Sequence, residues 1–374
     1  MRLARYRPVA LFLAAAVALE LLAVHGGKGF LLTQLTMSAY YTLVVLGLSL
    51  LMGYAGQISL GHAAFFAIGG YASAALTTWD LSAWGGTGLV KALVAAGALA
   101  ARRDAYGGPV LAFHPWLACA CAVALALLVA WLVGIPVLKL TGHYLAMATL
   151  GVGTIILSVA VGTEALGAAD GISGVPPFPL LFGAAVGGSA AERVVNYYVA
   201  FGLLALGLLL LSNLVDSRVG RALRAIHGAE DAAGAMGVDT GRLKLRTFVL
   251  SAGMAAVAGV FLTHFNGGIG PSEASIMKSV KYVSIVAVGG MGSLWGTLAT
   301  SLVLNFLSLR GYFGSFDDAV FGGILILIML FSPDGVLSPR LWRAARAAVL
   351  RPRPAEAPAA GDAPAAGDAP EDVR

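Results

Sequence analysis

The sequence has little charge. Of its 374 residues only 11% are charged, whereas 59% are hydrophobic, and the mean hydropathy is +0.85. A soluble domain carries about 25% charged residues, so this chain cannot cover the surface of a water-soluble protein. Apolar runs such as 9–24, 117–135 and 197–212 contain almost no group that needs water. Because about 20 such residues span a bilayer as a helix, the sequence predicts an all-α, polytopic membrane protein.

Cysteine is also scarce. Cys119 and Cys121 lie two residues apart in an apolar run, where a helix turns them to different faces. The pair therefore predicts neither a disulfide nor a metal site, and both side chains are expected to pack in the core or against lipid. Since no other His, Cys, Asp or Glu cluster has metal-ligand spacing, no metal site is predicted.

Basic residues lie at the ends of the apolar runs and indicate the orientation of the chain. The longest internal polar segment, 216–246, carries six of them, and five lie at 340–353, after the last apolar run. Three arginines precede the first run. By the positive-inside rule, both termini and the 216–246 segment are predicted to be cytoplasmic.

Ten predicted spans fit this orientation, six before the 216–246 segment and four after it. They are 9–24, 31–52, 60–78, 114–136, 143–163, 195–215, 247–266, 279–291, 295–310 and 318–332. The segment 86–104 also has an apolar centre, but Lys91, Arg102 and Arg103 favour an external surface segment. Glu273 and Lys278 are expected to be solvated in another outer loop.

Three regions follow from this pattern. Residues 1–29 are expected to form a retained first helix, because no small-x-small cleavage site precedes the next apolar run. Residues 30–340 form the membrane domain. Residues 341–374 are a basic and then disordered tail, because its end repeats "APAAGD" and has no large apolar residue to build a core.

A Gly-rich break, "MGYAGQISLGHAAFFAIGGYASA", interrupts the apolar sequence at 52–74. Irregular backbone at membrane depth is tolerated only where it is buried in protein or lines a wet cavity. Both helix packing and the lining of a translocation path stay open as interpretations. The residues concerned are Gly53, Gly56, Gln57, Ser59, Gly61 and His62. A second joint, "VGGMGSLWGTLATSLV" at 288–303, suggests an internal repeat of the kind that transporters contain.

Several motifs carry a resemblance to a known family. "GYAGQISLGHAAFFAIGGYASA", "HYLAMATLGVGTII", "DGISGVPP" and "FSPDGVLSP" resemble permease subunits of branched-chain amino acid ABC importers, of the LivM type, over roughly 30–340. The resemblance implies an ABC importer permease fold with broken or short helices in a bacterial inner membrane. It implies four kinds of partner: a second permease, two cytoplasmic ABC ATPases, a periplasmic or extracellular binding protein and the bilayer. Urea and short-chain amide importers have closely similar permeases, so the substrate stays open.

The same resemblance gives a role to the 216–246 segment. ABC importers contact their ATPases through a short cytoplasmic helix with the pattern E-A-A-x-x-x-G, which "DAAGAMG" follows with Asp in place of Glu. The family's I-x-L-P ending is replaced by "RTFVLSA". The alternative is a basic loop that only sets topology. The candidate coupling residues are Arg221, Arg224, Glu230, Asp231, Ala232, Ala233 and Gly237.

No enzymatic motif accompanies these features. Lys28 in "HGGKGF" lacks the spacing of a phosphate-binding loop, so the chain is expected to hold no cofactor, with ATP bound by partner subunits. The resemblance places Asp170, Gly171 and Ser173 at an outer mouth that meets the binding protein; an exposed turn is the alternative. A distant alternative is an intramembrane serine hydrolase that uses Ser173 with His264 as base, although the Pro-rich loop disfavours it.

Overall fold

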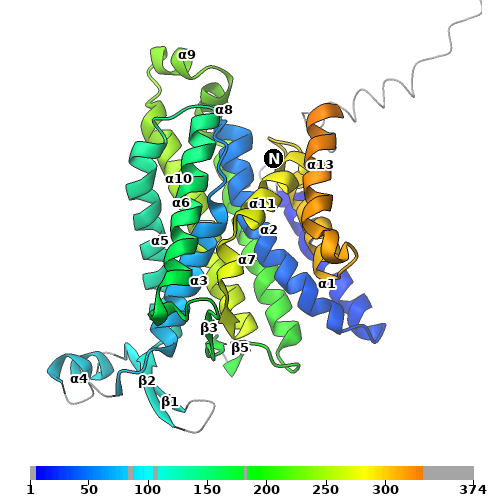
Figure 1. Cartoon of the computed structure of the whole chain (residues 1–374). Coiled ribbons are helices and arrows are strands. Elements are labelled where there is room, and N and C mark those ends of the chain that lie inside the picture. The colour runs from blue at the N-terminus through cyan, green and yellow to red at the C-terminus, as the bar shows by residue number, and fades with distance from the viewer. Residues whose placement is uncertain (1–5, 83–86, 96, 104–107, 181–182, 332–374) are drawn as a thin grey trace, which may run out of the picture. The chain divides into compact units, whose positions relative to one another are not determined.

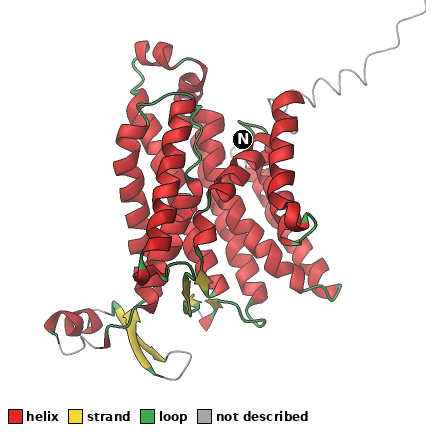
Figure 2. Cartoon of the chain, in the orientation of Figure 1, coloured by secondary structure: helices red, strands yellow, loops and turns green. Residues whose placement is uncertain are grey.

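Helices form most of the chain that the computed structural model describes, namely residues 6–82, 87–95, 97–103, 108–180 and 183–331 (Figure 2). The chain divides into two units, residues 1–338 and 339–374, and every described residue belongs to the first. The predicted disordered tail lies outside the described residues.

The longer helices alternate in direction along the first unit (Figure 1). They are α1 (Arg7–His25), α2 (Phe30–Ala55), α3 (His62–Thr78), α5 (Pro115–Val137), α6 (His143–Gly162), α7 (Arg193–Asp216), α10 (Thr240–Asn266), α11 (Ile276–Gly289), α12 (Leu294–Leu309) and α13 (Asp317–Phe331). The shorter helices are α4 (Gly88–Ala95), α8 (Arg218–Gly228), α9 (Glu230–Ala235) and the 3₁₀ turns η3 (Glu164–Leu166), η5 (Pro271–Ala274) and η6 (Gly314–Phe316).

Each of the ten predicted spans falls on one of the longer helices. Six of them, α1, α2, α5, α6, α7 and α10, are long and apolar enough to cross a membrane. The other four, α3, α11, α12 and α13, have 14 to 17 residues. A mostly helical, multi-pass membrane protein is therefore confirmed, whereas the count of ten spans stays a prediction.

The sequence predicts an all-α protein, but the structure also contains short strands at one end of the helices. The strands are β1 (Leu99–Arg103), β2 (Pro109–Phe113), β3 (Ile172–Ser173), β4 (Phe178–Pro179), β5 (Ala185–Val186) and β6 (Gly268–Ile269). They pair antiparallel as β1–β2, β3–β6 and β4–β5. These segments lie outside the helices, where backbone groups still need hydrogen-bond partners, and the short ladders supply them.

The uncertain segment 86–104 contains α4 and β1. With eight residues, α4 rises only about 12 Å, far less than the roughly 30 Å of a bilayer core. Strand β1 then pairs with β2 from Leu99 opposite Phe113 to Arg103 opposite Pro109. The described part of the segment therefore forms no further span, in agreement with the prediction of a surface segment.

Local sequence explains where α8 and α10 begin. The Ser217 hydroxyl accepts hydrogen bonds from the first backbone amides of α8, and Asp239 Oδ1 accepts one from the Arg242 N–H at 3.1 Å. Such side chains satisfy amides that have no partner in the first helical turn. As a result α10 begins at Thr240, and the last part of the predicted 216–246 segment belongs to this long helix.

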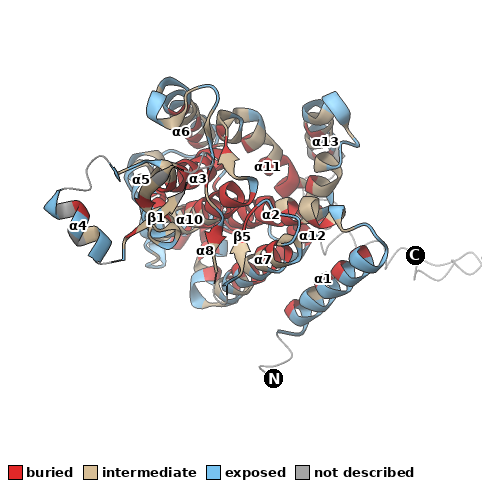
Figure 3. Ribbon diagram, turned by 90° about the horizontal axis from the view of Figure 1, so that it is seen from below, coloured by how far each residue is buried: buried red, intermediate tan, exposed pale blue. Residues whose placement is uncertain are grey.

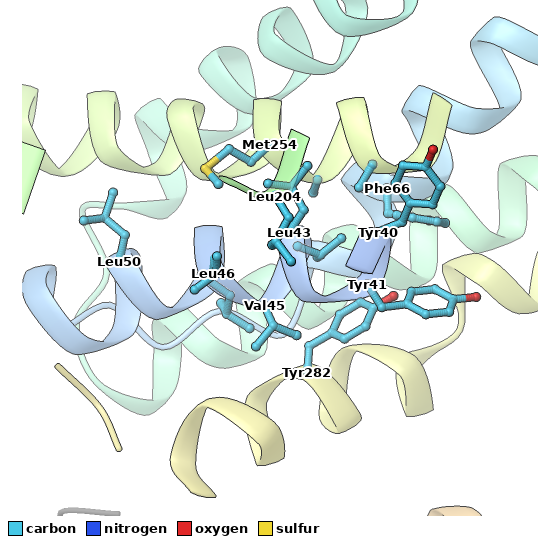
Figure 4. Close-up of a cluster of buried hydrophobic side chains, with 14 of the residues drawn as sticks. Tyr40, Tyr41, Leu43, Val45, Leu46, Leu50, Phe66, Leu204, Met254 and Tyr282 are labelled. Atoms are coloured by element: carbon cyan, nitrogen blue, oxygen red, sulfur yellow. The ribbon is translucent and has the colours of Figure 1, made fainter. Parts of the chain in front are cut away.

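Of the six helices that are long and apolar enough to cross a membrane, α2 and α10 are the most buried. In their apolar stretches 89% and 78% of the residues are buried, compared with 22% in α1. Figure 3 shows the buried residues concentrated on α2, α3, α10 and α11, whereas α1 is exposed on most of its surface. The core contains large side chains from several helices, among them Tyr40, Tyr41, Phe66 and Tyr282 (Figure 4).

Glycine allows α3 and α10 to touch at the backbone. A Cβ atom on Gly259 would lie 2.0 Å from the carbonyl oxygen of Phe66, and one on Gly69 would lie 2.3 Å from that of Ala256. Real Cβ atoms do not approach so closely. Small residues at such positions are what permit close helix association in membranes.

Gly259→Ala is therefore expected to separate α3 from α10 and to destabilise the protein by about 1–3 kcal/mol, as overpacking does. The melting temperature of the purified chain in detergent would fall. The matched control is Gly202→Ala on α7, where an added Cβ meets nothing within 4 Å. Equal melting temperatures for the two variants would contradict the contact.

Candidate functional site

The Gly-rich break is a short non-helical passage between α2 and α3. Helix α2 ends at Ala55 because Gly56 takes a φ of +68°, which side chains with a Cβ rarely adopt. Residues 56–61 are irregular and α3 begins at His62. Gln57 and Ser59 are each only 2% exposed. The polar side chains of the break are therefore buried in protein, one of the two settings in which irregular backbone is tolerated, whereas Gly56 and Ile58 are exposed.

His62 connects this break to α10. Its side chain is fully buried; Nδ1 lies 3.0 Å from Ser59 Oγ and Nε2 lies 2.6 Å from Ser251 Oγ. Two predicted residues, Ser59 and His62, are thus in contact, and their third partner is Ser251 on α10. The sequence analysis missed Ser251, since 189 residues separate it from His62.

Gln57 differs from its neighbours because its side-chain amide has no hydrogen-bond partner among the described residues. Both Oε1 and Nε2 of its amide are buried and make no hydrogen bond with any described residue. Nearby, the Leu60 N–H donates to Thr149 Oγ1 at 3.0 Å, and Gly61 packs against the Thr149 carbonyl. An amide left unsatisfied in the interior is costly, so the Gln57 amide is available to a group other than the described residues.

The two Gly-rich joints that sequence analysis matched are in contact with one another. A Cβ on Gly53 would lie 2.3 Å from the backbone nitrogen of Gly292, and the Tyr54 hydroxyl donates to the Gly292 carbonyl at 2.8 Å. The joints α2–α3 and α11–α12 therefore meet backbone to backbone.

Helix α8 packs beside the same break. A Cβ atom added to Gly56 would lie 3.4 Å from the Cα atom of His227. Arg224 donates to the Val215 carbonyl at 2.7 Å, and its guanidinium carbon lies 6.0 Å from the centre of the Tyr54 ring. Arg224 thus connects α8 to the end of α7 and to α2, although both Arg221 and Arg224 are exposed over much of their surface.

Helix α9 carries the candidate coupling residues from Glu230 to Ala233. It lies next to the N-terminal end of α10 (Figure 1). Ala233 is buried, whereas Asp231 and Ala232 are exposed. Gly237 follows the helix with a φ of +85°, a conformation that favours glycine.

An ion pair holds α9 against α10. Lys244 Nζ lies 2.7 Å from Glu230 Oε1, and the side chains are 7% and 37% exposed. The lysine on α10 is therefore the buried member of the pair, and Glu230 is its counter-charge.

The predicted mouth residues lie at the opposite end of the unit from α9 (Figure 1). Strand β3 pairs with β6, with Ile172 opposite Ile269 and Ser173 opposite Gly268. Asp170 and Ser173 are exposed. Gly171 packs tightly against the Ile269 carbonyl.

The hydrolase alternative needs His264 as a base for Ser173, but both ring nitrogens of His264 have other partners. Nε2 lies 2.8 Å from Ser73 Oγ, and Nδ1 lies 2.7 Å from the Pro176 carbonyl. His264 therefore serves as a structural link between α3, α10 and the outer loop, and the structure provides no base for Ser173 among these contacts.

The expectation that Glu273 and Lys278 are solvated is wrong. The two side chains form an ion pair and are only 16% and 27% exposed. The Tyr41 hydroxyl donates to Glu273 Oε1 at 3.2 Å, and Lys278 Nζ donates to the same hydroxyl at 3.0 Å. The available signal was a pair of opposite charges five residues apart at the edge of an apolar run.

Comparison with known proteins identifies the family. A family model described as "Branched-chain amino acid transport system / permease component" matches residues 30–330. The chain belongs to this family. The family consists of transport permeases rather than enzymes, and the resemblance seen in the sequence motifs is confirmed.

Individual relatives of this branched-chain permease agree. The chain is 30% identical over 323 residues to the high-affinity branched-chain amino acid transport system permease protein LivM of Escherichia coli, covering 81% of this chain and 68% of LivM. It is 28% identical over 318 residues to LivH of Salmonella typhimurium, covering 81% of this chain and 92% of LivH. No solved structure matches the chain.

Within this permease, Glu230→Gln is expected to loosen α9, because it leaves the buried Lys244 charge without its partner. Amide hydrogen exchange over 230–235 should become about tenfold faster, as expected when a hydrogen bond to a charged group is lost. Arg242→Gln is the control, since its pair with Asp239 has side chains 79% and 55% exposed and such pairs contribute little. Equal exchange in both variants would show that the Glu230–Lys244 pair does not hold α9.

Proposed function

We propose that the chain is the transmembrane permease subunit of an ATP-driven ABC importer for branched-chain amino acids, leucine, isoleucine and valine. The family match over 30–330 carries this proposal. The names of LivM and LivH, both permease proteins of high-affinity branched-chain amino acid transport systems, support it.

In this proposal the ten longer helices cross a bacterial inner membrane, with both termini in the cytoplasm. The arrangement of the helices supports this topology. The beginning of α1, the end of α13 and helix α9 lie toward one end of the unit, and the paired strands lie at the other (Figure 1). The four shorter helices are compatible with crossing where neighbouring helices bury them.

The proposed partners are a second permease subunit, two cytoplasmic ATPases that bind ATP, and an external binding protein. Similarity to both LivM and LivH supports pairing with a second, related permease. ATP hydrolysis by the partners would supply the energy, and this chain would supply alternating access without covalent chemistry.

The proposed coupling element is α9 with the glycine turn after it. The exposed residues Asp231 and Ala232 leave a small surface free for a groove in an ATPase. The Glu230–Lys244 ion pair would pass a displacement of α9 to α10. Two turns further along α10, Ser251 contacts His62, so the same displacement would reach the Gly-rich break.

The break itself is the proposed inner part of the translocation path. It offers sparse polar groups, Gln57, Ser59 and His62, in apolar surroundings. An amino acid with an aliphatic side chain suits such a path, because weak binding there would permit release. At the other end, the exposed residues Asp170 and Ser173 are the proposed contacts of the binding protein.

A urea or short-chain amide permease is the second candidate, because closely similar permeases serve those substrates. Leucine uptake by cells that lack this chain and are complemented with it separates the candidates, with urea and acetamide as competitors. Leucine uptake that urea leaves unchanged supports the proposal, whereas labelled urea entering instead of leucine would overturn the substrate.

Gly237→Arg is expected to abolish leucine uptake for two reasons. The backbone at this position has a φ of +85°, which strains any residue with a Cβ, and the long side chain would block entry of α9 into the groove of the ATPase. Gly241→Arg is the matched control, since it adds the same side chain near the start of α10, where a Cβ has open space around it. Co-purification with the partner permease checks assembly. Full uptake by a Gly237→Arg chain would exclude α9 as the coupling element.

Gln57→Leu and His62→Leu are expected to slow leucine uptake without preventing assembly. Gln57→Leu removes an amide with no partner among the described residues, so the melting temperature should not fall. His62→Leu also removes two hydrogen bonds and should lower it. Wild-type uptake by both variants would make the break a packing feature only.

A further inference from the structure

A small cavity opens beside the predicted mouth, between α3, α10 and the chain that follows β6. Its volume is about 100 Å³. Its lining includes Phe66, Thr263, Asn266, Ile269, Gly270 and Glu273. It is therefore a small, mostly polar cavity that brings a carboxylate, an amide and a hydroxyl together beside Phe66 and Ile269.

The ion pair described above places its carboxylate at this cavity, with the ammonium group of Lys278 directly behind it. Glu273 lines it directly, and Lys278 bonds both to Glu273 and to the Tyr41 hydroxyl. The pair is largely buried and lies next to helices that are predicted to cross the membrane. Ionised groups in that setting are costly and are retained mainly where they serve a function.

Two hydroxyl groups near the pair have no partner. The Tyr282 and Tyr71 side chains are 1% and 4% exposed, and neither hydroxyl bonds to any described residue. The Tyr282 ring lies 6.3 Å from that of Tyr41, and both are seen in Figure 4. Tyr71 packs in one cluster with Ile269 and Ala274, the neighbours of the cavity and of Glu273. Buried hydroxyls of this kind are normally satisfied, so both are able to bond to a further group beside the ion pair.

We propose that Glu273, Lys278, Tyr71 and Tyr282 bind the zwitterionic head of an amino acid on its way in from the mouth. Glu273 takes the ammonium group, and Lys278 with the two hydroxyls takes the carboxylate. Phe66 and Ile269 provide apolar surface for the start of an aliphatic side chain. This inference rests on the proposed import of amino acids and names the groups in the permease that recognise them.

Charge balance explains why a zwitterion fits this site. The Glu273–Lys278 pair is a dipole, and an amino acid aligned antiparallel to it can exchange partners with it while every charge stays paired. No net charge is then added to a low-dielectric region. Urea and acetamide carry no formal charge and cannot replace either member of the pair. The site therefore distinguishes amino acids from the substrates of the second candidate function.

The test uses the complete transporter in proteoliposomes, with leucine-loaded binding protein at saturation, so that the affinity of the binding protein does not affect the rate. Tyr282→Phe and Tyr71→Phe remove hydroxyls that bond to nothing in the described chain, so the folded protein loses no contact. Each is expected to reduce leucine uptake about tenfold, the effect of one lost hydrogen bond to a charged group.

Tyr40→Phe is the matched control. Its hydroxyl is also buried without a partner among the described residues, but its ring packs against Phe261 and Phe265, away from the ion pair. It is expected to transport leucine at the wild-type rate. Wild-type rates for Tyr282→Phe and Tyr71→Phe would overturn the proposal.

A double variant, Glu273→Gln with Lys278→Met, removes both charges at once and leaves neither unpaired. It is expected to assemble and hydrolyse ATP but to lose more than tenfold in leucine uptake, as expected when two charged contacts are removed. If this variant does not assemble, the tyrosine variants decide. If the unmodified transporter imports urea and not leucine, the proposed function itself is wrong. If the variants import leucine at the wild-type rate, only the proposed binding site is wrong.

Discussion

Backbone contact between α3 and α10 brings together the buried serine and histidine side chains of these two helices. Gly69 and Gly259 bring the two helices so close that no side chain fits between their backbones at these points. Only at this separation can His62 at the start of α3 reach Ser251, and Ser73 near its other end reach His264. Two serine–histidine contacts, one at each end, thus fix both the distance between the helices and their register.

Three of the buried polar side chains that lack a partner among the described residues lie in two separate places. Gln57 lies at the break near α8, and Tyr71 and Tyr282 lie beside the outer ion pair. Between them the core contains Leu43, Val45, Leu46 and other apolar side chains (Figure 4). The two places are therefore separated by apolar side chains of the core.

The sequence allows the positions of the spans to be predicted, because the cost of exposing backbone to lipid requires long apolar helices wherever the chain crosses. It also indicates the break, since Gly56 and Gln57 contradict their apolar surroundings. It could not supply the partners, because Ser251 and Thr149 are ordinary residues whose importance comes only from packing between distant segments. Glu273 and Lys278 were misjudged for the same reason. Charges near a helix start usually face water, and only the positions of Tyr41, Tyr71 and Tyr282 around them reveal burial.

The contact between Gly53 and Gly292 has a mechanical consequence. Side chains between two helices can change rotamer and absorb a displacement, but here backbone meets backbone and nothing soft lies between the joints. The α2–α3 joint therefore cannot shift while the α11–α12 joint stays in place. A displacement of one joint is then expected to move the other joint with it.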